Sequence, residues 1–224
     1  MIDDVLSDEF PGIARLFPLP NLVLFPGVIQ GLHIFEPRYR QMTADALASD
    51  SLIALVLLQP DWEERYDQKP PIVPVACVGR IVWSEILPDG RYNLRLRGLN
   101  RVRIVEELPS DRLYRTARVD RLIETAPTDL NESKTLRQEL ASVILPRFEN
   151  NDPARRQIQE LFDGEMSLGQ LCDILAYAMP LPLELKQAML AEPHAGLRAI
   201  AITAALRTSA SQAKRPFPPG FSPN

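Results

Sequence analysis

The residues that could bind a metal are few and widely spaced in this chain of 224 residues. Its only histidines are His33 and His194, and its only cysteines are Cys77 and Cys172. No Cys-x-x-Cys pair is present, so the ligand spacing that is typical of structural zinc sites is missing. A site made from His33, Glu36 and Cys77 would need the fold to bring them together. A half-exposed strand position explains His33 more simply, and we predict neither a metal nor a cofactor.

Motifs for nucleotide hydrolysis and for serine-based peptide cleavage are missing from the sequence. A phosphate-binding loop ends in Gly-Lys, but no lysine follows a glycine here. A Gly-x-Ser-x-Gly nucleophile elbow is also missing. We therefore expect a chain that is not an enzyme and has no catalytic residue. Its four lysines are isolated from one another: Lys69, Lys134, Lys186 and Lys214.

Arginines are concentrated between residues 80 and 121, where a groove for nucleic-acid phosphates is one interpretation. The other is a solvated sheet face, because the same stretch contains ten arginines and six acidic residues, a local charge of only +4. Surfaces that bind single-stranded nucleic acid usually add aromatic rings for base stacking, and Tyr92 falls on the opposite, apolar side of its strand. We favour the solvated face. The series consists of Arg91, Arg95, Arg97, Arg101, Arg103, Arg112, Arg115, Arg118 and Arg121.

Four aromatic residues are the candidates for holding a polypeptide, since exposed rings act as anchors in protein recognition. Phe25 lies beside Pro26 and Gly27, and Trp62 lies in a polar loop, so both could be exposed. Phe35 and Tyr39 could border the same surface. The alternative for Tyr39 and for Phe25 is a place in the hydrophobic core, and the sequence leaves it open.

Composition favours an ordinary globular protein. With 46% hydrophobic residues the chain can bury a core, and a net charge of −4 gives no general attraction to nucleic acid or anionic membranes. The first residues lack the basic and apolar regions of a signal peptide. The longest apolar run, 52–58, is much shorter than the ~20 residues that cross a bilayer. We expect a cytoplasmic protein with reduced cysteines.

The first half of the chain, about 11–125, has the pattern of short strands with one helix. Glu36 stands where a helix cap would, with Pro37 at the first helical position, and apolar residues at helical spacing predict a helix over 37–49. The run 52–58 is apolar throughout and predicts a strand buried on both faces. We predict a compact, partly closed β-barrel. Its other strands are expected at 32–35, 75–86, 92–97 and 101–104 and near 117–119, with an interruption at 98–100.

The second half, about 126–207, has the pattern of a helical bundle. Ser167 and Gln170 have the capping-box spacing that begins a helix, and prolines separate further helices at 183–191 and 195–207. Residues 1–10 are expected to be a flexible tail, and the proline-rich residues 208–224 a disordered one. The predicted fold class is α+β, a barrel followed by a bundle.

Two stretches near the amino terminus carry the most specific pattern: Leu-Phe-Pro-Leu-Pro-Asn-Leu-Val-Leu-Phe-Pro-Gly at 16–27, and Leu-His-Ile-Phe-Glu-Pro-Arg-Tyr at 32–39. They resemble the opening of the amino-terminal, substrate-recognition domain of Lon-type proteases. Similar segments follow in the family's order, so the resemblance covers about residues 15–207. Two places depart from it, Gln30-Gly31 and the proline-dense run 69–74. The later matching segments are 78–82, 87–90, 96–104 and 179–190.

The resemblance implies a PUA-like β-barrel followed by helices, which engages unfolded or marked polypeptides without catalytic residues of its own. The Ser-Lys dyad of Lon peptidases belongs to a separate domain that has no counterpart here. We therefore predict a non-catalytic recognition or adaptor module for proteolysis or quality control, with a protease or chaperone as its possible partner. The alternatives are a PUA-like RNA-binding module and a small-molecule sensor.

Overall fold

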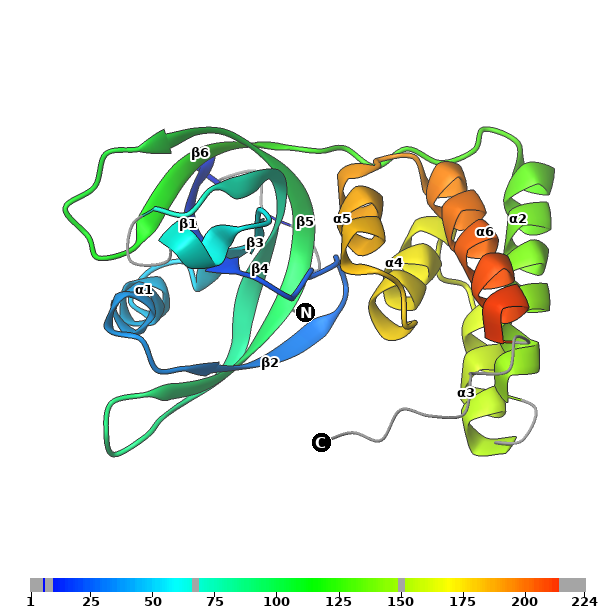
Figure 1. Cartoon of the computed structure of the whole chain (residues 1–224), viewed down its shortest axis with the longest axis horizontal. Helices are drawn as coiled ribbons and strands as arrows, with labels where there is room; N and C mark the ends of the chain where they lie inside the picture. The colour runs from blue at the N-terminus through cyan, green and yellow to red at the C-terminus, as the bar shows by residue number, and fades with distance from the viewer. Residues whose placement is uncertain (1–5, 7–9, 66–68, 149–151, 214–224) are drawn as a thin grey trace. The chain divides into compact units, whose positions relative to one another are not determined.

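The computed structural model describes residues 6, 10–65, 69–148 and 152–213 (Figure 1). The chain forms two compact units. The first contains residues 1–125 together with 173–193, and the second contains residues 126–172 together with 194–224. Residues 173–193, expected in the helical bundle, therefore group with the barrel.

The first unit is built on one strongly curved sheet. Its strand order is β2-β5-β4-β3-β1-β6, and β6 also pairs with β5. Five strands thus close on themselves and leave β2 as an edge strand, which confirms the predicted partly closed barrel. Only β1 and β3 pair in parallel among the described strands. The strands are β1 (Ile13–Leu19), β2 (Ile29–Ile34), β3 (Leu52–Leu58), β4 (Ile72–Ile86), β5 (Tyr92–Leu108) and β6 (Arg115–Arg121).

The barrel interior is filled by small and branched apolar side chains. Every residue of β3 is buried, as its unbroken apolar run predicts. Ala54, Ala76 and Ala117 are all 0% exposed, which lets the sheet curve tightly around the core. Leu6 joins this core, and its N–H donates to Asn100 Oδ1 at 2.7 Å. The rest of the expected tail before residue 10 lies outside the described residues.

Helix α1 (Pro37–Leu47) begins where the sequence predicts, with Pro37 in its first turn and Glu36 at the N-cap. The Glu36 side chain makes no capping bond and instead pairs with Arg38 at 2.7 Å. The pairing with β4 shifts register at the expected interruption 98–100, where Val78 lies opposite Asn100 and Gly79 opposite Gly98, although β5 itself runs on through it. Gly98 makes this possible: its N–H donates to Val28 O and its carbonyl accepts from the N–H of Gly27, so the two segments lie in direct contact.

The second unit is helical. The predicted capping box is confirmed: the Ser167 N–H donates to Gln170 Oε1 at 2.9 Å, and the Gln170 N–H donates to Ser167 Oγ at 3.1 Å. Helix α4 follows it and crosses into the first unit at Asp173, and α5 belongs to the first unit. Helix α6 reaches Ala213 rather than residue 207, because no proline occurs before residue 216, and residues 214–224 lie outside the described part. The remaining helices are α2 (Leu130–Ile144), α3 (Asp152–Asp163), α4 (Leu168–Ala178), α5 (Leu183–Ala191) and α6 (Ala195–Ala213), with short 3-10 turns at Trp62–Arg65 (η1) and Leu145–Phe148 (η2).

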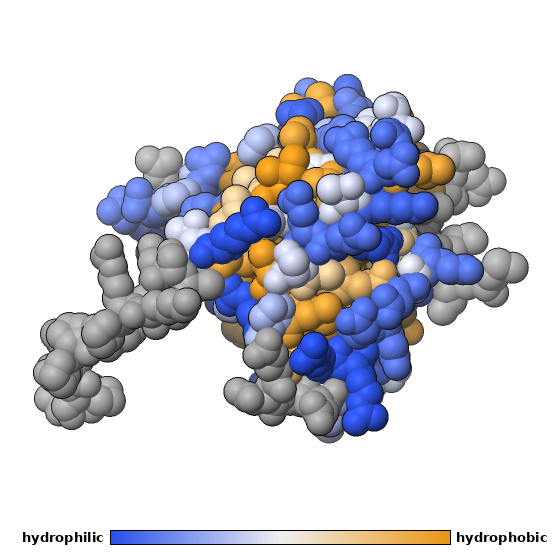
Figure 2. Space-filling model, turned by 90° about the vertical axis from the view of Figure 1, so that its right-hand side faces the viewer, coloured by the Kyte–Doolittle hydropathy of each residue, from blue (hydrophilic) through white to orange (hydrophobic). Residues whose placement is uncertain are grey.

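Some apolar side chains of the second unit remain at its surface. Leu130 is 77% exposed, and Leu197 and Ile200, which share one face of α6, are each 51% exposed. Figure 2 shows apolar surface interspersed with hydrophilic residues on the side that it views. Apolar residues exposed in this scattered way are normal for proteins. No helix in the described part of the chain is long and apolar enough to cross a membrane.

Candidate functional site

Two hollows of the first unit lie where β1 and β3 end. These two strands are parallel, with Leu19 opposite Leu57, so their carboxyl ends meet at the same edge of the sheet. Pro20 then takes the chain away from β1, and Gln59 and Pro60 take it away from β3. Two pockets open around these strand ends, and Leu58 lines both.

The larger pocket, which we call the Trp62 groove, has a volume of about 490 Å³. After β3 the chain turns sharply at Asp61, whose φ of 61° is the left-handed conformation that aspartate tolerates better than most residues. This turn places half-buried Trp62 at the start of η1, along the groove. The walls are mainly apolar, and its lining residues are Pro20, Leu57, Leu58, Gln59, Pro60, Asp61, Trp62, Glu63, Val73, Leu183, Glu184 and Gln187.

Helix α5 supplies the wall opposite the sheet residues of the Trp62 groove. Gln187 Nε2 donates to the Val75 carbonyl at 3.0 Å, which holds α5 against β4. Leu183 and Glu184 at the start of the same helix also line the groove, the first apolar and the second exposed and acidic. The groove therefore offers an apolar interior with a polar rim, as is common in ligand sites.

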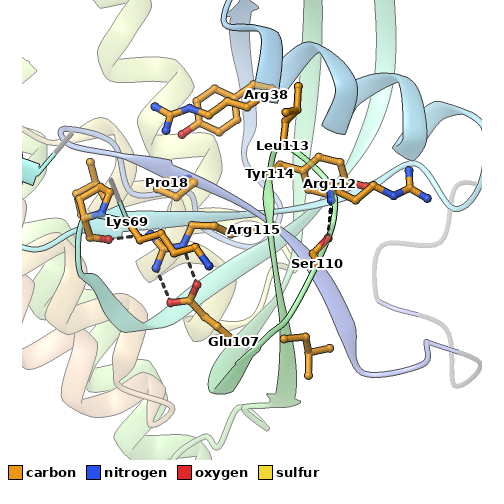
Figure 3. Close-up of a pocket in the computed structure, with 13 residues that line it drawn as sticks. Pro18, Arg38, Lys69, Glu107, Ser110, Arg112, Leu113, Tyr114 and Arg115 are labelled. Atoms are coloured by element: carbon orange, nitrogen blue, oxygen red, sulfur yellow. Dashed lines mark hydrogen bonds and ion pairs between the residues drawn. The ribbon is translucent and has the colours of Figure 1, made fainter. Parts of the chain in front are cut away.

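The smaller pocket, which we call the cationic pocket, has a volume of about 170 Å³. Arg115 Nε donates to Glu107 Oε2 at 2.8 Å, and Arg115 Nη1 donates to the Pro70 carbonyl at 2.8 Å (Figure 3). Arg115, together with the charge of Lys69, holds the pKa of the Glu107 carboxyl below its usual value. The pocket is lined by Pro18, Arg38, Tyr39, Leu58, Lys69, Pro70, Glu107, Leu108, Ser110, Arg112, Leu113, Tyr114 and Arg115.

The four aromatic candidates from the sequence do not form one surface. Trp62 lies along the groove as described, and Phe35 is 58% exposed beside His33 but lines neither pocket. Tyr39 is only 6% exposed, packs on Phe17 at 4.6 Å between ring centroids, and reaches the cationic pocket.

Of the two interpretations left open for Phe25, the core one holds, because its side chain is fully buried and Phe25 cannot act as an exposed anchor. The chain at Phe25 is pressed against β5: a Cβ on Gly98 would lie only 2.1 Å from the Phe25 carbonyl oxygen. The Phe-Pro-Gly turn therefore packs against β5 at Gly98, and Phe25 is part of the core.

A metal site at His33, Glu36 and Cys77 has no support. Cys77 is fully buried, and this burial raises the pKa of its thiol to about 12. His33 Nδ1 is 2.8 Å from Asn93 Oδ1 on the neighbouring strand. Within the described ranges, no group of three or more His, Cys, Asp or Glu side chains could hold a metal ion.

The arginine series is distributed over separate interactions instead of one groove. Arg101 is buried against Asp173, and Arg95 lies over the Trp83 ring, 5.5 Å from its centroid. Arg101 is therefore an exception to the solvated-face interpretation, because it is only 3% exposed, whereas the exposed pairs of other members fit that interpretation. Further surface ion pairs are Arg91–Asp89 at 2.6 Å and Arg118–Glu106 at 3.0 Å.

Sequence reasoning missed several lining residues of both pockets. Leu183 was assigned to the helical bundle, and Lys69 and Tyr114 were not singled out at all. One sequence feature could have indicated these residues: the proline-dense run 69–74 departs from the family pattern, and in the structure it lies beside both pockets.

Comparisons with known proteins agree on one family. Residues 13–208 match the model of the ATP-dependent protease La (LON) substrate-binding domain. Lon protease 2 of Myxococcus xanthus is 28% identical over 184 residues, which are 82% of this chain and 22% of that protein. Lon protease of Flavobacterium johnsoniae is 30% identical over 132 residues, 59% of this chain and 16% of that protein. The chain thus spans less than a quarter of these relatives, and no protease domain is shown within it.

Two solved structures share the fold. The N-terminal domain of Mycobacterium avium complex Lon protease superimposes with a TM-score of 0.67 at 18% identity, covering 87% of this chain and 98% of that one. The crystal structure of a Lon N-terminal domain protein from Xanthomonas campestris gives 0.60 at 23% identity, covering 91% and 99%. The family match over most of the chain and the shared barrel lead to one assignment: this chain belongs to the Lon substrate-binding domain family.

Proposed function

We propose that the chain is a recognition module that binds apolar segments of unfolded or marked polypeptides in the Trp62 groove. The family description names a substrate-binding domain, and the relatives are Lon proteases. Binding would serve to deliver such segments to a protease or chaperone, in a cytoplasmic setting that keeps Cys77 and Cys172 reduced. The contribution of this chain is binding rather than bond cleavage.

The observation that carries the proposal is the groove itself. Its volume of about 490 Å³ falls in the range of ligand pockets, about 300–1,000 Å³. Trp62, Pro20 and Val73 provide apolar contact from three separate segments. A half-buried tryptophan can cover an incoming side chain while its ring edge stays near water.

The expected affinity is low. Burial of about 400 Å² of apolar surface would give roughly 10 kcal/mol at 25 cal/mol per Å². Association and ordering cost about 4–15 kcal/mol, which offsets most of that gain. Weak binding with little sequence preference follows, and it suits a module that must accept many unfolded chains.

The chain's two tryptophans allow a direct test. A Trp83→Phe variant leaves Trp62 as the single tryptophan, and its emission is followed while a short, uncharged peptide rich in Leu, Phe and Val is added. We expect a saturable change in emission. The Trp62→Ala variant should lose most of the affinity, measured by anisotropy of the labelled peptide, and Trp62→Phe should retain much of it.

A second assay uses a full-length client. The purified protein is mixed with an unfolded, aggregation-prone protein, and light scattering and co-sedimentation are followed. Suppressed aggregation is expected. The proposal is refuted if neither the peptide nor the client binds when the protein is in excess. RNA binding that weakens steeply with salt would support the alternative of an RNA-binding module.

A further inference from the structure

The proline-dense run 69–74 borders the cationic pocket, and the binding of apolar segments in the Trp62 groove does not explain why it is there. Proline has a fixed φ and no N–H donor, so such a run has little freedom to rearrange. Gln59 also holds the run through two hydrogen bonds. Its N–H donates to the Pro71 carbonyl and its Nε2 donates to the Ile72 carbonyl, each at 2.9 Å. The run therefore places the backbone of Lys69, its first residue, beside the cationic pocket.

Lys69 is the one cation of the pocket lining that makes no direct ion pair among the described residues, although its charge acts on nearby Glu107. Arg38 pairs with Glu36 at 2.7 Å, Arg112 pairs with Asp45, and Arg115 pairs with Glu107. No ion pair joins Lys69 to another residue among those described, and its side chain is exposed. The pocket thus has one positive charge in excess.

The pocket already stabilises a carboxylate of its own. Glu107 lies beside Lys69 and Arg115 (Figure 3). The lowered pKa of Glu107 shows that this environment favours a negative oxygen over a protonated one. A second carboxylate brought in by a ligand would meet the same two cations.

The rest of the lining suits a carboxylate that is attached to a carbon chain. Leu58, Leu108 and Leu113 add apolar surface next to the cations. The volume of about 170 Å³ corresponds to roughly six water molecules, enough for one short side chain. Leu58 also lines the Trp62 groove, so a single extended segment could occupy both pockets.

We propose that the cationic pocket binds a carboxylate of the polypeptide whose apolar side chains lie in the Trp62 groove, with Lys69 as its ion-pair partner. The carboxylate belongs to an Asp or Glu side chain or to the carboxyl terminus of the segment. This inference rests on the proposed polypeptide binding and specifies which segments are preferred: apolar ones with an adjacent negative charge.

The test compares labelled peptides that differ only in this charge. One apolar peptide has a Glu after the apolar run and an amidated carboxyl terminus, a second has Gln at that position with the amide, and a third has Gln with a free terminal carboxylate. We expect the Glu peptide, the free-acid peptide or both to bind about fivefold more tightly than the neutral one. Which of the two gains affinity identifies the source of the carboxylate. The gain should shrink as salt is raised.

Two variants assign the effect to the pocket. Lys69→Gln should remove the gain and leave binding of the neutral peptide unchanged, whereas Lys134→Gln, which removes an exposed lysine on α2 outside the pocket lining, should keep the gain. Glu107→Gln should increase affinity for the acidic peptides, because it frees Arg115 and Lys69. This increase should be absent for the neutral peptide, whereas apolar surface exposed by misfolding would raise the binding of all three peptides.

Equal binding of all three peptides to the unaltered protein would overturn this inference and leave the proposed function intact. A gain that persists in Lys69→Gln would also overturn it. Failure of every peptide to bind would refute the proposed function and this inference together.

Discussion

The buried ion pair between Arg101 on β5 and Asp173 on α4 should be the main link between the barrel and the helices of the first unit. Both side chains are 3% exposed. Arg101 Nη1 donates to Asp173 Oδ2 at 3.0 Å, Nη2 donates to Oδ1, and Nε donates to the Leu190 carbonyl on α5 at 3.1 Å. The Asp173→Asn variant keeps the shape of the side chain and removes its charge.

After this change the Arg101 guanidinium would remain buried, with Glu124 as its nearest carboxylate at 3.7 Å. Glu124 is 38% exposed and too distant for a strong hydrogen bond. Removing one partner of a buried pair costs about 3–5 kcal/mol, because the other charge is left without compensation. We expect a loss of that size in the free energy of unfolding. Replacing both residues, Arg101→Met with Asp173→Leu, should cost less than Asp173→Asn alone.

Urea denaturation followed by tryptophan fluorescence measures this loss, since Trp62 and Trp83 both lie in the first unit. Hydrogen exchange of the α5 amides should accelerate in parallel. The matched control is Glu106→Gln, which breaks the surface pair with Arg118, where the side chains are 51% and 59% exposed. Its cost should stay below about 1 kcal/mol. If Asp173→Asn costs no more than this control, the buried pair is not the link that we infer.

Three further predictions concern stability. Gly98→Ala should lower the melting temperature strongly, because the new Cβ would lie 2.1 Å from the Phe25 carbonyl oxygen; an unchanged melting curve would contradict this. Ser167→Ala should cost about 1 kcal/mol by removing half of the capping box, measured by circular dichroism during urea denaturation, and a cost near zero would show that the cap contributes nothing. The buried Cys77 thiol should react with thiol reagents only on unfolding. The fold raises the pKa of this thiol from 9.0 to about 12, so above pH 9.0 the thiol loses its proton in the unfolded chain but keeps it in the folded one. The free energy of unfolding should therefore fall as pH rises above 9.0.

Local signals in the sequence were sufficient for individual elements of the fold. An unbroken apolar run predicted β3, a proline in the first turn predicted the start of α1, and reciprocal capping predicted the start of α4. Each of these depends on neighbours within a few residues. At 98–100 the sequence indicated an irregularity, which the shifted pairing with β4 shows, but it did not indicate that β5 continues, because the reason for Gly98, the carbonyl of Phe25, lies far away in the chain.

The site could be predicted only in part, for the same physical reason. Trp62 was chosen as a candidate because loops run over protein surfaces, and it does lie along the groove. The wall that α5 adds to its groove depends on contacts across the chain, such as Gln187 with Val75, for which no local pattern exists. Phe25 shows how a local pattern can mislead: the turn beside it suggested an exposed ring, but the ring is buried by residues that are distant in the sequence.

The position of both pockets follows from how the barrel core ends. β1 pairs with β3 as far as Leu19, and Pro20, which follows it, has no N–H to continue the pairing. The pairing of β3 with β4 is already irregular between Val56 and Leu58. The sheet therefore opens where a strand buried on both faces reaches the surface. A ligand in the Trp62 groove would contact the end of the core itself. Truncating Trp62 could therefore lower affinity in two ways, by removing contact with the ligand or by disturbing the core. Trp62→Phe separates them, because it preserves most of the packing. If Trp62→Phe binds and unfolds as the unaltered protein does, the loss of affinity in Trp62→Ala is assigned to lost contact.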